Sequence, residues 1–545
     1  MIGNVGTEAV VYRAAEVVTG DLAGTVTTGF LVRDRRIAAV GEADGAGGLI
    51  AAAGRDASVV DLGAATVVPG LIDAHCHISM LAYLLTGADC SPAAAPSIAA
   101  IGARLAATAP GPEGWITGSG YAEYKLTDGR HPTRADLDAA VGDVPCVLFH
   151  LSLHLCVVNS AALRELGLTD VSPDPDHGWL GRDADGHLDG RLIETLALDL
   201  LGANMRRRLE TLDGAGRAAF VRRAGDHLAS LGITSCSDAA ADAGTFLALR
   251  EAERRGELPV RVSVMFTYPE AGWLLRAGMT TGFGSDRLRI GAIKLFCDGG
   301  MSSRTAAVDE PYEVEPYDTG LLWYEPEALA AIIRECDAAG FQVAIHAQGE
   351  RGIRTTLAAY DAVVAPGNPL RHRIEHGGCF TPELRAVAAR LGIHVVSQPA
   401  FFSALGDGYI EAFGAARTAG LYPYASLRDA GVLVAGSSDA PVIDASPLTA
   451  MRDAIVRRTD GGGHVAEAEA IPADEALAMY TRNAAFVLHR EDAVGSLEVG
   501  KLADFTVLDR NPLTAAPETL AETVVLRTVV GGVTTFDHSR EAVHA

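Results

Sequence analysis

The sequence predicts an α/β fold: a (β/α)8 TIM barrel with an inserted α+β subdomain and a small β-sandwich formed by both chain ends. Eight short apolar segments have the pattern of buried strands, and helical patterns lie between most of them. About 150 residues separate the first of these strands from the second, far more than an ordinary βα loop holds. Both chain ends instead show short strands and turns, with no pattern for a long helix.

The barrel prediction depends on these eight strand segments and on the helices between them. The segment 325–340 has apolar residues at helical spacing and ends on a glycine, as a helix C-cap often does. The segment 381–392 opens with Thr-Pro, which suits the N-cap and N1 positions, and also closes on glycine. The predicted strands cover residues 67–77, 233–238, 260–268, 289–297, 341–346, 371–376, 393–398 and 432–438.

The predicted domain boundaries follow from these segments. Residues 1–66 and 489–545 are expected to form the two parts of the β-sandwich, because chain ends often lie close together. Residues 67–79 hold barrel strand one, and residues 213–488 hold the rest of the barrel. Residues 80–212 form the inserted subdomain. Because it follows strand one, we expect it over the C-terminal face of the barrel, where active sites lie.

Composition and charge exclude several classes of function. The chain has 545 residues, of which 48% are hydrophobic, and its net charge is −24. An acidic surface argues against nucleic acid and against an anionic membrane as partners, because both require Lys and Arg. The N-terminal segment lacks a basic and apolar leader pattern, and no apolar run approaches the ~20 residues of a membrane span. We therefore expect a cytoplasmic homo-oligomer, a dimer, that acts on a small molecule.

Several of the predicted strands end in residues that can bind a metal. His75 and His77 lie two residues apart, so both imidazoles point to one side of a strand. Asp73, two residues earlier on that face, is placed to orient a ligating ring. Imidazole is the commonest neutral metal ligand and suits zinc. Later strands end in four more candidates: Lys294, His346, His376 and Asp439.

Lys294 is unusual among these candidates. It is flanked by apolar residues, and a buried ammonium tends to lose its proton. A neutral amine can add carbon dioxide to give a carbamate, whose two oxygens can bridge two metal ions. The alternative is a buried lysine paired with Asp298 or Asp439.

Three further residues have a functional and a structural interpretation. Asp298 either contacts substrate or is a turn residue before two glycines. Arg304 either clamps a carbonyl or carboxylate or forms a structural salt bridge. His154 either reaches the site from the insertion as an oxyanion donor or is a core histidine.

Two acidic residues near the candidate ligands have structural interpretations. Glu375 precedes His376 in a strand and therefore faces the other way, so we expect it among the surrounding helices. Glu350 is expected to be an acid in the first turn of a helix.

Several motifs, in this order and spacing, resemble the amidohydrolase superfamily, in particular amidohydrolase family 3, the branch that includes N-substituted formamide deformylase. The resemblance covers nearly the whole chain. HLCVVNSAAL (154–163) and GRLIE (190–194) are similar to motifs of the family's insertion, in which Asn159 and Glu194 act as scaffolding. The other motifs are PGLIDAHCH (69–77), IKLFCDGGMSSRTAAV (293–308), HAQGERGI (346–353), RIEHGG (373–378), GSSDAPV (436–442) and GSLEVGKLADFTVLD (495–509).

The chain departs from the family pattern at a few positions. The family usually has HAxGD, whereas this chain has Glu350 in place of the aspartate. After His154 the chain has Leu155 and Val157, where the family usually has Ser and Trp. These departures concern the substrate rather than the chemistry.

The resemblance implies a metal-dependent hydrolase of non-peptide C–N bonds, acting on a small N-acyl or N-formyl compound through a metal-activated hydroxide. His75, His77 and Asp439 would hold one divalent ion, with zinc expected. His346 and His376 would hold a second, bridged by the Lys294 carbamate, while Asp439 carries protons. Three alternatives remain: a one-metal ring deaminase, a cyclic-amide or lactone hydrolase, and a non-catalytic barrel that only binds its ligand.

Overall fold

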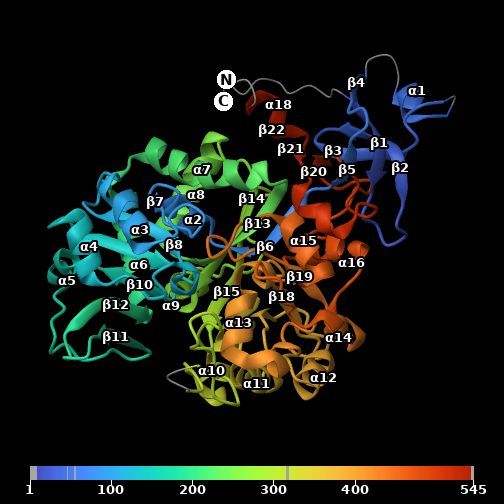
Figure 1. The fold of residues 1–545 in the computed structure, drawn as a ribbon. Coiled ribbons are helices and arrows are strands. Elements are labelled where there is room, and N and C mark those ends of the chain that lie inside the picture. Colours follow the sequence, from blue (N-terminus) through green and yellow to red (C-terminus); the bar gives the residue numbers. More distant parts are fainter. Residues whose placement is uncertain (1–8, 46, 54–56, 315–317, 542–545) are drawn as a thin grey trace.

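A parallel sheet of eight strands forms the centre of the computed structural model, which describes residues 9–45, 47–53, 57–314 and 318–541. Each strand pairs in parallel with the next one along the chain. This is the predicted TIM-like barrel (Figure 1). Its strands are β6 (Leu71–Cys76), β13 (Ile233–Ala241), β14 (Arg261–Thr267), β15 (Leu288–Phe296), β16 (Val343–Ala347), β17 (Arg373–His376), β18 (His394–Ser397) and β19 (Val434–Gly436).

The first and last strands meet at their C-terminal ends. The backbone N–H of Asp439 donates to the carbonyl of His75 at 2.8 Å, and the N–H of His77 donates to the carbonyl of Ala440 at 2.7 Å. The Asp73 carboxylate accepts the N–H of Ser438 at 3.0 Å. These contacts bring the HxH segment beside Asp439, although the two lie more than three hundred residues apart in the chain.

The segment predicted as strand one, residues 67–77, is two strands in the structure. Its first part, β5 (Thr66–Pro69), pairs with β1 and β20 of another sheet, and only β6 belongs to the barrel. The chain turns between them at Gly70, where an added Cβ would lie 2.2 Å from Oγ1 of Thr234. A glycine is therefore needed for the chain to pass from one sheet to the other.

Helices surround the barrel, and their ends follow local sequence signals. The predicted helix over 381–392 is α12 (Pro382–Leu391); Thr381 accepts the N–H of Leu384, and Gly392 closes the helix with φ +68°. The others are α7 (Gly214–Ser230), α8 (Ala243–Arg255), α9 (Tyr268–Arg276), α10 (Pro326–Ala338), α11 (Glu350–Asp361), α13 (Phe401–Thr418), α14 (Tyr424–Asp429), α15 (Pro447–Val456), α16 (Ala473–Met479) and α17 (Arg482–Val487).

The long segment after strand one contains a second sheet, with strand order β11-β12-β10-β9-β8-β7, which lies beside the barrel (Figure 1). Side chains of this segment, such as Trp115 and Phe149, share one continuous hydrophobic core with barrel residues. Its strands are β7 (Ala88–Asp89), β8 (Ile116–Tyr121), β9 (Cys146–His150), β10 (Leu155–Val158), β11 (Gly178–Arg182) and β12 (Leu188–Glu194). Its helices are α2 (Ile78–Leu84), α3 (Ile98–Ala106), α4 (Arg134–Val141), α5 (Ser160–Leu166) and α6 (Thr195–Thr211).

Strands from both chain ends form one further sheet, in which β20 pairs with β5 (Figure 1). Tyr12, Phe30 and Phe505 pack in its core with ring centroids 4.8 to 5.1 Å apart. The sandwich form expected for this sheet stays a prediction. Its elements are β1 (Val10–Val18), β2 (Val26–Arg33), β3 (Arg36–Gly41), α1 (Leu49–Ala53), β4 (Ser58–Asp61), β5, β20 (Phe505–Leu508), β21 (Val525–Val530) and β22 (Val533–Asp537), followed by α18 (His538–Glu541).

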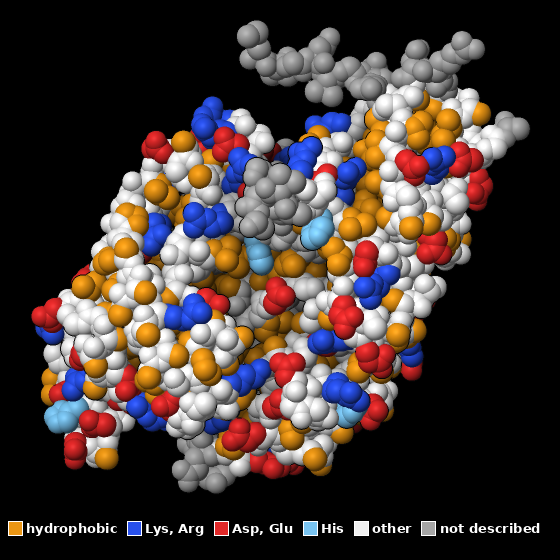
Figure 2. All heavy atoms as spheres, turned by 45° about the horizontal axis from the view of Figure 1, so that its top comes forward, with side chains coloured by type: hydrophobic (Ala, Val, Ile, Leu, Met, Phe, Trp, Pro, Cys, Tyr) orange, Lys and Arg blue, Asp and Glu red, His pale blue; other side chains and the backbone are white. Residues whose placement is uncertain are grey.

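The surface and the thiols are unexceptional. Figure 2 shows acidic and basic side chains interspersed over one face of the molecule. Within the part of the chain that the structure describes, no helix has the length and apolarity needed to cross a bilayer. All eight cysteines are buried and free.

Candidate metal centre

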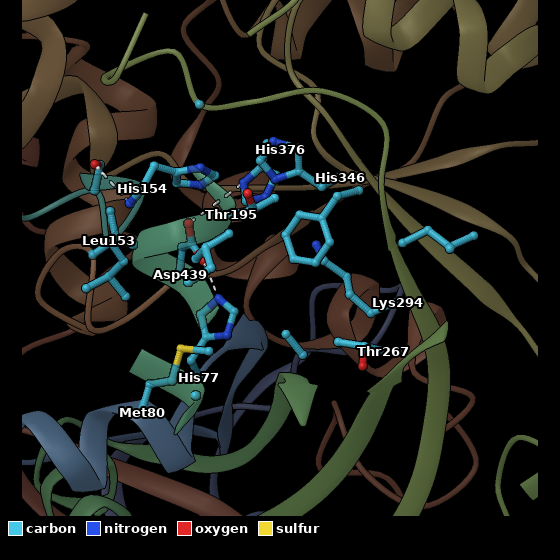
Figure 3. Close-up of a pocket in the computed structure, with 18 of the residues that line it drawn as sticks. His77, Met80, Leu153, His154, Thr195, Thr267, Lys294, His346, His376 and Asp439 are labelled. Atoms are coloured by element: carbon cyan, nitrogen blue, oxygen red, sulfur yellow. Dashed lines mark hydrogen bonds and ion pairs between the residues drawn. The ribbon is translucent and has the colours of Figure 1, made fainter. Parts of the chain in front are cut away.

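A cavity of about 370 Å³ opens at the C-terminal ends of the barrel strands. The six predicted metal-binding residues and His154 all line it, although they come from six separate parts of the chain. Figure 3 shows His77, His154, Lys294, His346, His376 and Asp439 around this common space. The barrel therefore brings together the polar residues that end its strands.

Three side chains form the tightest group. The ligand atoms of His75, His77 and Asp439 lie within 4.8 Å of one another. Oδ1 of Asp439 is 3.0 Å from Nε2 of His77 and 3.3 Å from Nε2 of His75. These separations are close to the ~3.4 Å edge of a zinc tetrahedron.

A second group faces the first across the cavity. The rings of His346 and His376 have centroids 4.4 Å apart, and His376 lies 5.0 Å from His75. Nδ1 of His376 is 3.9 Å from Oδ2 of Asp439, which connects the two groups. Burial lowers the pKa of His376 to about 3, so its ring is neutral, as a metal ligand must be.

Each of the four histidines has one ring nitrogen next to a protein oxygen other than those of Asp439. In a neutral ring with the hydrogen on that nitrogen, the other nitrogen keeps a lone pair for a metal, as is usual for metal-binding histidines. The pairs are His75 Nδ1 with Glu375 Oε2, His77 Nδ1 with the Ala239 carbonyl at 2.7 Å, His346 Nε2 with the Gly299 carbonyl at 3.0 Å, and His376 Nδ1 with Gln398 Oε1 at 3.0 Å.

This hydrogen-bonding pattern tests whether the residues fit a cation. With hydrogen on Nδ1, Nε2 of His77 carries a lone pair, yet it lies only 3.0 Å from the Asp439 carboxylate. His75 repeats the arrangement at 3.3 Å. Lone pairs at these distances repel unless a positive charge lies between them. The donor set therefore fits a divalent metal ion.

Lys294 extends from β15 into the same cavity and is 1% exposed. Among the described residues its Nζ has no hydrogen-bond partner. Burial lowers the pKa of Lys294 to about 8, although the charges of Glu375 and Asp439 act in the opposite direction. The alternative of a lysine paired with Asp298 or Asp439 is not what the described residues show, since no such ion pair forms among them.

The strand pattern predicts that Glu375 lies among the helices, but the structure places it elsewhere. It is fully buried inside the barrel, where it accepts hydrogen bonds from Nδ1 of His75 and, at 2.6 Å, from Nε of Arg373. Glu375 shares the inward face with Arg373, two residues earlier, and His376 faces inward as well because its φ of +71° lies outside the strand region. Sequence patterning has no signal for this backbone conformation.

Asp73 also differs from its expected role. Its carboxylate contacts the backbone N–H of His75, not the ring, and accepts hydrogen bonds from the N–H and hydroxyl of Ser438. Burial raises the pKa of Asp73 to about 6, although these hydrogen bonds act in the opposite direction. Asp73 therefore joins β6 to the segment that carries Asp439.

His154 reaches the cavity from the inserted segment. Its Nδ1 lies 2.8 Å from Oε2 of the buried Glu194, and its ring lies 5.9 Å from that of His346. Burial lowers the pKa of His154, but the charge and hydrogen bond of Glu194 outweigh it, so the pKa is raised. Glu194 has φ +57°, a strained conformation that typically marks functional sites.

The structure places Asp298 and Arg304 outside the residues that line the cavity. Asp298 is buried and accepts backbone N–H groups of Ala307, Gln348 and Gly349 at 2.8 to 3.0 Å, so it holds the loops around His346. Arg304 lies at a turn with φ +61°, which directs it into a separate polar hollow 4.0 Å from Glu411. Arg304 therefore does not line this cavity.

Apolar side chains make up much of the remaining cavity wall. The insertion contributes Leu153 and the face of α6 that carries Leu198 and Met205. Aromatic residues complete the wall, and only the tertiary fold identifies them: Phe296, Trp323, Tyr324, Phe401 and Tyr409.

Comparisons with known proteins found a matching family, similar sequences and a similar fold. The sequence profile of the amidohydrolase family matches residues 58–536. The N-substituted formamide deformylase of Arthrobacter pascens is 32% identical, over 96% of this chain and 98% of its own. A putative amidohydrolase of Bacillus subtilis, YtcJ, is 28% identical over 88% of this chain and 90% of its own. A crystal structure of an uncharacterised metal-dependent hydrolase from Pyrococcus horikoshii has a TM-score of 0.77 and 26% identity, and the match covers 94% of this chain and 99% of that one.

Proposed function

The chain belongs to the amidohydrolase family, and from this premise we propose that it hydrolyses the amide C–N bond of a small N-acyl or N-formyl compound. The observation that carries the proposal is the convergence in one cavity of four histidines, Asp439 and a lysine amine that has no hydrogen-bond partner among the described residues. The relative from Arthrobacter pascens, by its name, removes formyl groups from N-substituted formamides, which supports a small acyl group here.

We assign His75, His77 and Asp439 to one divalent ion, expected to be zinc, and His346 and His376 to a second. Lys294 would be a ligand of both ions in the form of a carbamate, which forms when its neutral amine adds carbon dioxide and loses one proton. The lowered pKa of the amine favours this modification, as does the absence of a hydrogen-bond partner for it among the described residues. Metal ions bound there would polarise the amide carbonyl and lower the pKa of water.

Asp439 is the residue that would move protons. Its Oδ1 lies 3.0 Å from Nε2 of His77, and its Oδ2 lies 3.9 Å from Nδ1 of His376, so the carboxylate borders both groups of histidines. The carboxylate is therefore placed to take a proton from the attacking water. It would pass this proton to the amide nitrogen, because an amine leaves only after protonation.

His154 would stabilise the negative charge that develops on the carbonyl oxygen. Its Nδ1 is held by Glu194, and its raised pKa favours the protonated ring, whose Nε2–H can donate into the cavity. The apolar wall formed by Leu153, Leu198 and Met205 suits the organic part of the amine.

A substrate panel tests the proposal. Protein supplied with zinc and bicarbonate is offered formamides, acetamides, ureas, cyclic amides and lactones, and amine release and metal content are measured together. Hydrolysis of linear formamides or acetamides is the expected result. Activity confined to lactones or ring amides would contradict it.

One alternative has support of its own. His75, His77 and Asp439 alone form a three-ligand group that fits a single metal ion, as in a ring deaminase. Ammonia release from aminated rings with one metal per chain, unchanged in a Lys294→Met variant, would favour this alternative.

A further inference from the structure

Three side chains of the insertion contact one another in a row that begins at the cavity wall. Ser152 lines the cavity, and its Oγ lies 2.8 Å from Nδ1 of His150. Nε2 of His150 lies 3.1 Å from Oε2 of Glu123. Glu123 in turn borders the separate polar hollow that also contains Arg304. A serine in the cavity wall is thus connected through a buried histidine to a carboxylate.

The contacts of His150 determine which of its nitrogens carries the hydrogen. The backbone N–H of Ser152 donates to Nδ1 at 3.2 Å, so Nδ1 is an acceptor and Nε2 carries the hydrogen. Nε2 and the facing oxygen of Glu123 are both buried 3.1 Å apart, and neither makes a hydrogen bond of standard geometry among the described residues. At this distance the carboxylate attracts the N–H electrostatically.

Glu123 is held in its charged form. Burial raises the pKa of its carboxyl, but its contacts with His150 and His131 outweigh burial and lower it to about 2. A carboxylate only accepts hydrogen bonds, so it keeps the hydrogen of His150 on Nε2.

The same logic determines the direction of the Ser152 hydroxyl. With Nδ1 of His150 as an acceptor at 2.8 Å, the hydroxyl donates its only hydrogen to it. The Ser152 oxygen already accepts the N–H of His154 at 3.3 Å, which leaves it one further lone pair. Ser152 can therefore offer the cavity an acceptor, and no donor.

We propose that Ser152 recognises an N–H group of the substrate, so that the site selects secondary amides over tertiary amides and esters. This inference rests on the proposed function and adds the substrate class to it. Hydrolysis would be carried out by the metal-binding residues that line the same cavity, and Ser152 would orient the scissile amide through its nitrogen. A tertiary amide or an ester has no N–H and leaves the buried oxygen unpaired, which costs binding.

The main test compares three substrates with one acyl group: a secondary amide, its N-methyl tertiary amide and the matching ester. Wild type should favour the secondary amide in kcat/KM. Ser152→Ala should lower kcat/KM for the secondary amide by roughly tenfold, the size of one net hydrogen bond, and change the other two far less. Ser152→Thr keeps the hydroxyl and should restore the preference. Equal losses for all three substrates would overturn the inference, because they indicate a merely structural role.

Variants of His150 test how the Ser152 hydroxyl is oriented. His150→Asn retains an acceptor near the Nδ1 position and should keep most of the preference, whereas His150→Leu should weaken it. A matched control is Ser302→Ala, since Ser302 also lines the cavity but is not part of the chain of three. If Ser302→Ala removes the preference and Ser152→Ala does not, the assignment to Ser152 is wrong.

Two measurements that do not depend on turnover separate this inference from the proposed function. Nitrogen NMR of labelled histidines, with His150→Asn to assign the signal, should show hydrogen on Nε2 of His150. Titration of metal-depleted protein should show tighter binding of the secondary than of the tertiary amide, in wild type only. If wild type hydrolyses no amide, the proposed function fails, and this titration alone decides the inference. Hydrogen on Nδ1, or equal binding of both amides, overturns it.

Discussion

The carboxylate of Glu375 accepts a hydrogen bond from Nδ1 of His75, on a strand with which its own strand does not pair. Its other oxygen accepts from Nε of Arg373 at 2.6 Å. One buried carboxylate thus orients a candidate metal ligand and neutralises a buried arginine. A variant of Glu375 should therefore change two properties that can be measured separately: metal affinity and the stability of the barrel.

Glu375→Ala should weaken metal binding by roughly 10–100-fold, because His75 loses the partner that orients its ring. It should also lower the free energy of unfolding by about 3–5 kcal/mol, because Arg373 is left buried without its counter-charge. Metal competition titration and thermal unfolding measure the two effects. Asp504→Asn is the matched control: it breaks the buried Arg261–Asp504 pair in a different part of the protein and should reduce stability alone. Unchanged metal affinity in Glu375→Ala would contradict the orienting role.

The purified protein should contain up to two divalent ions per chain, and chelation should abolish activity. We expect metal because Nε2 of His75 and of His77 each face the Asp439 carboxylate, an arrangement of lone pairs that a cation between them would stabilise. Elemental analysis before and after dialysis against a chelator, with zinc added back, measures both. Full activity in protein shown to contain no metal would contradict this prediction.

Lys294→Ala should lose both metal and activity, because the carbamate proposed for this residue can no longer form. Short carboxylic acids at high concentration should partly restore both, since a carboxylate occupying the space left by the side chain replaces the missing bridge. Lys294→Met is the control for packing, because it fills the volume without a nitrogen. A fully active Lys294→Met variant would show that the amine is not needed.

Asp439→Asn should lower kcat by roughly 10²–10⁴, the range for loss of general acid–base catalysis. The amide retains the size of the side chain and one oxygen, so metal content should fall far less than in His75→Ala. Steady-state kinetics and metal analysis on the same preparations make the comparison. Equal metal losses in the two variants would show that Asp439 acts chiefly as a ligand.

His154→Ala should lower kcat by a similar factor for every amine in a series with one acyl group, up to ~10²–10³. Glu194→Gln should cause a smaller loss, because the raised pKa of His154 depends chiefly on the Glu194 charge and hydrogen bond. If the losses instead vary with the amine and appear in KM, His154 shapes the amine pocket. If neither parameter changes, His154 has no direct part in the reaction.

The sequence by itself determined the barrel and the residues that end its strands. Eight apolar segments with helices between them leave few other folds, and parallel strands carry their C-terminal residues to one face. His75, His77, Lys294, His346 and Asp439 could therefore be assigned to one cavity from strand positions alone. This reasoning needs only the period of a strand and the direction of the chain.

The tertiary structure decided what surrounds those residues. Glu375 faces inward together with Arg373, His376 also faces inward because of its positive φ, and Arg304 left the cavity because its loop turns there. Asp73 joins two strands that are adjacent only because the barrel closes. The connection of Ser152 through His150 to Glu123 likewise depends on how the insertion folds. Strand alternation predicts the face of a residue only while the backbone stays extended, and contacts between distant segments have no local signal.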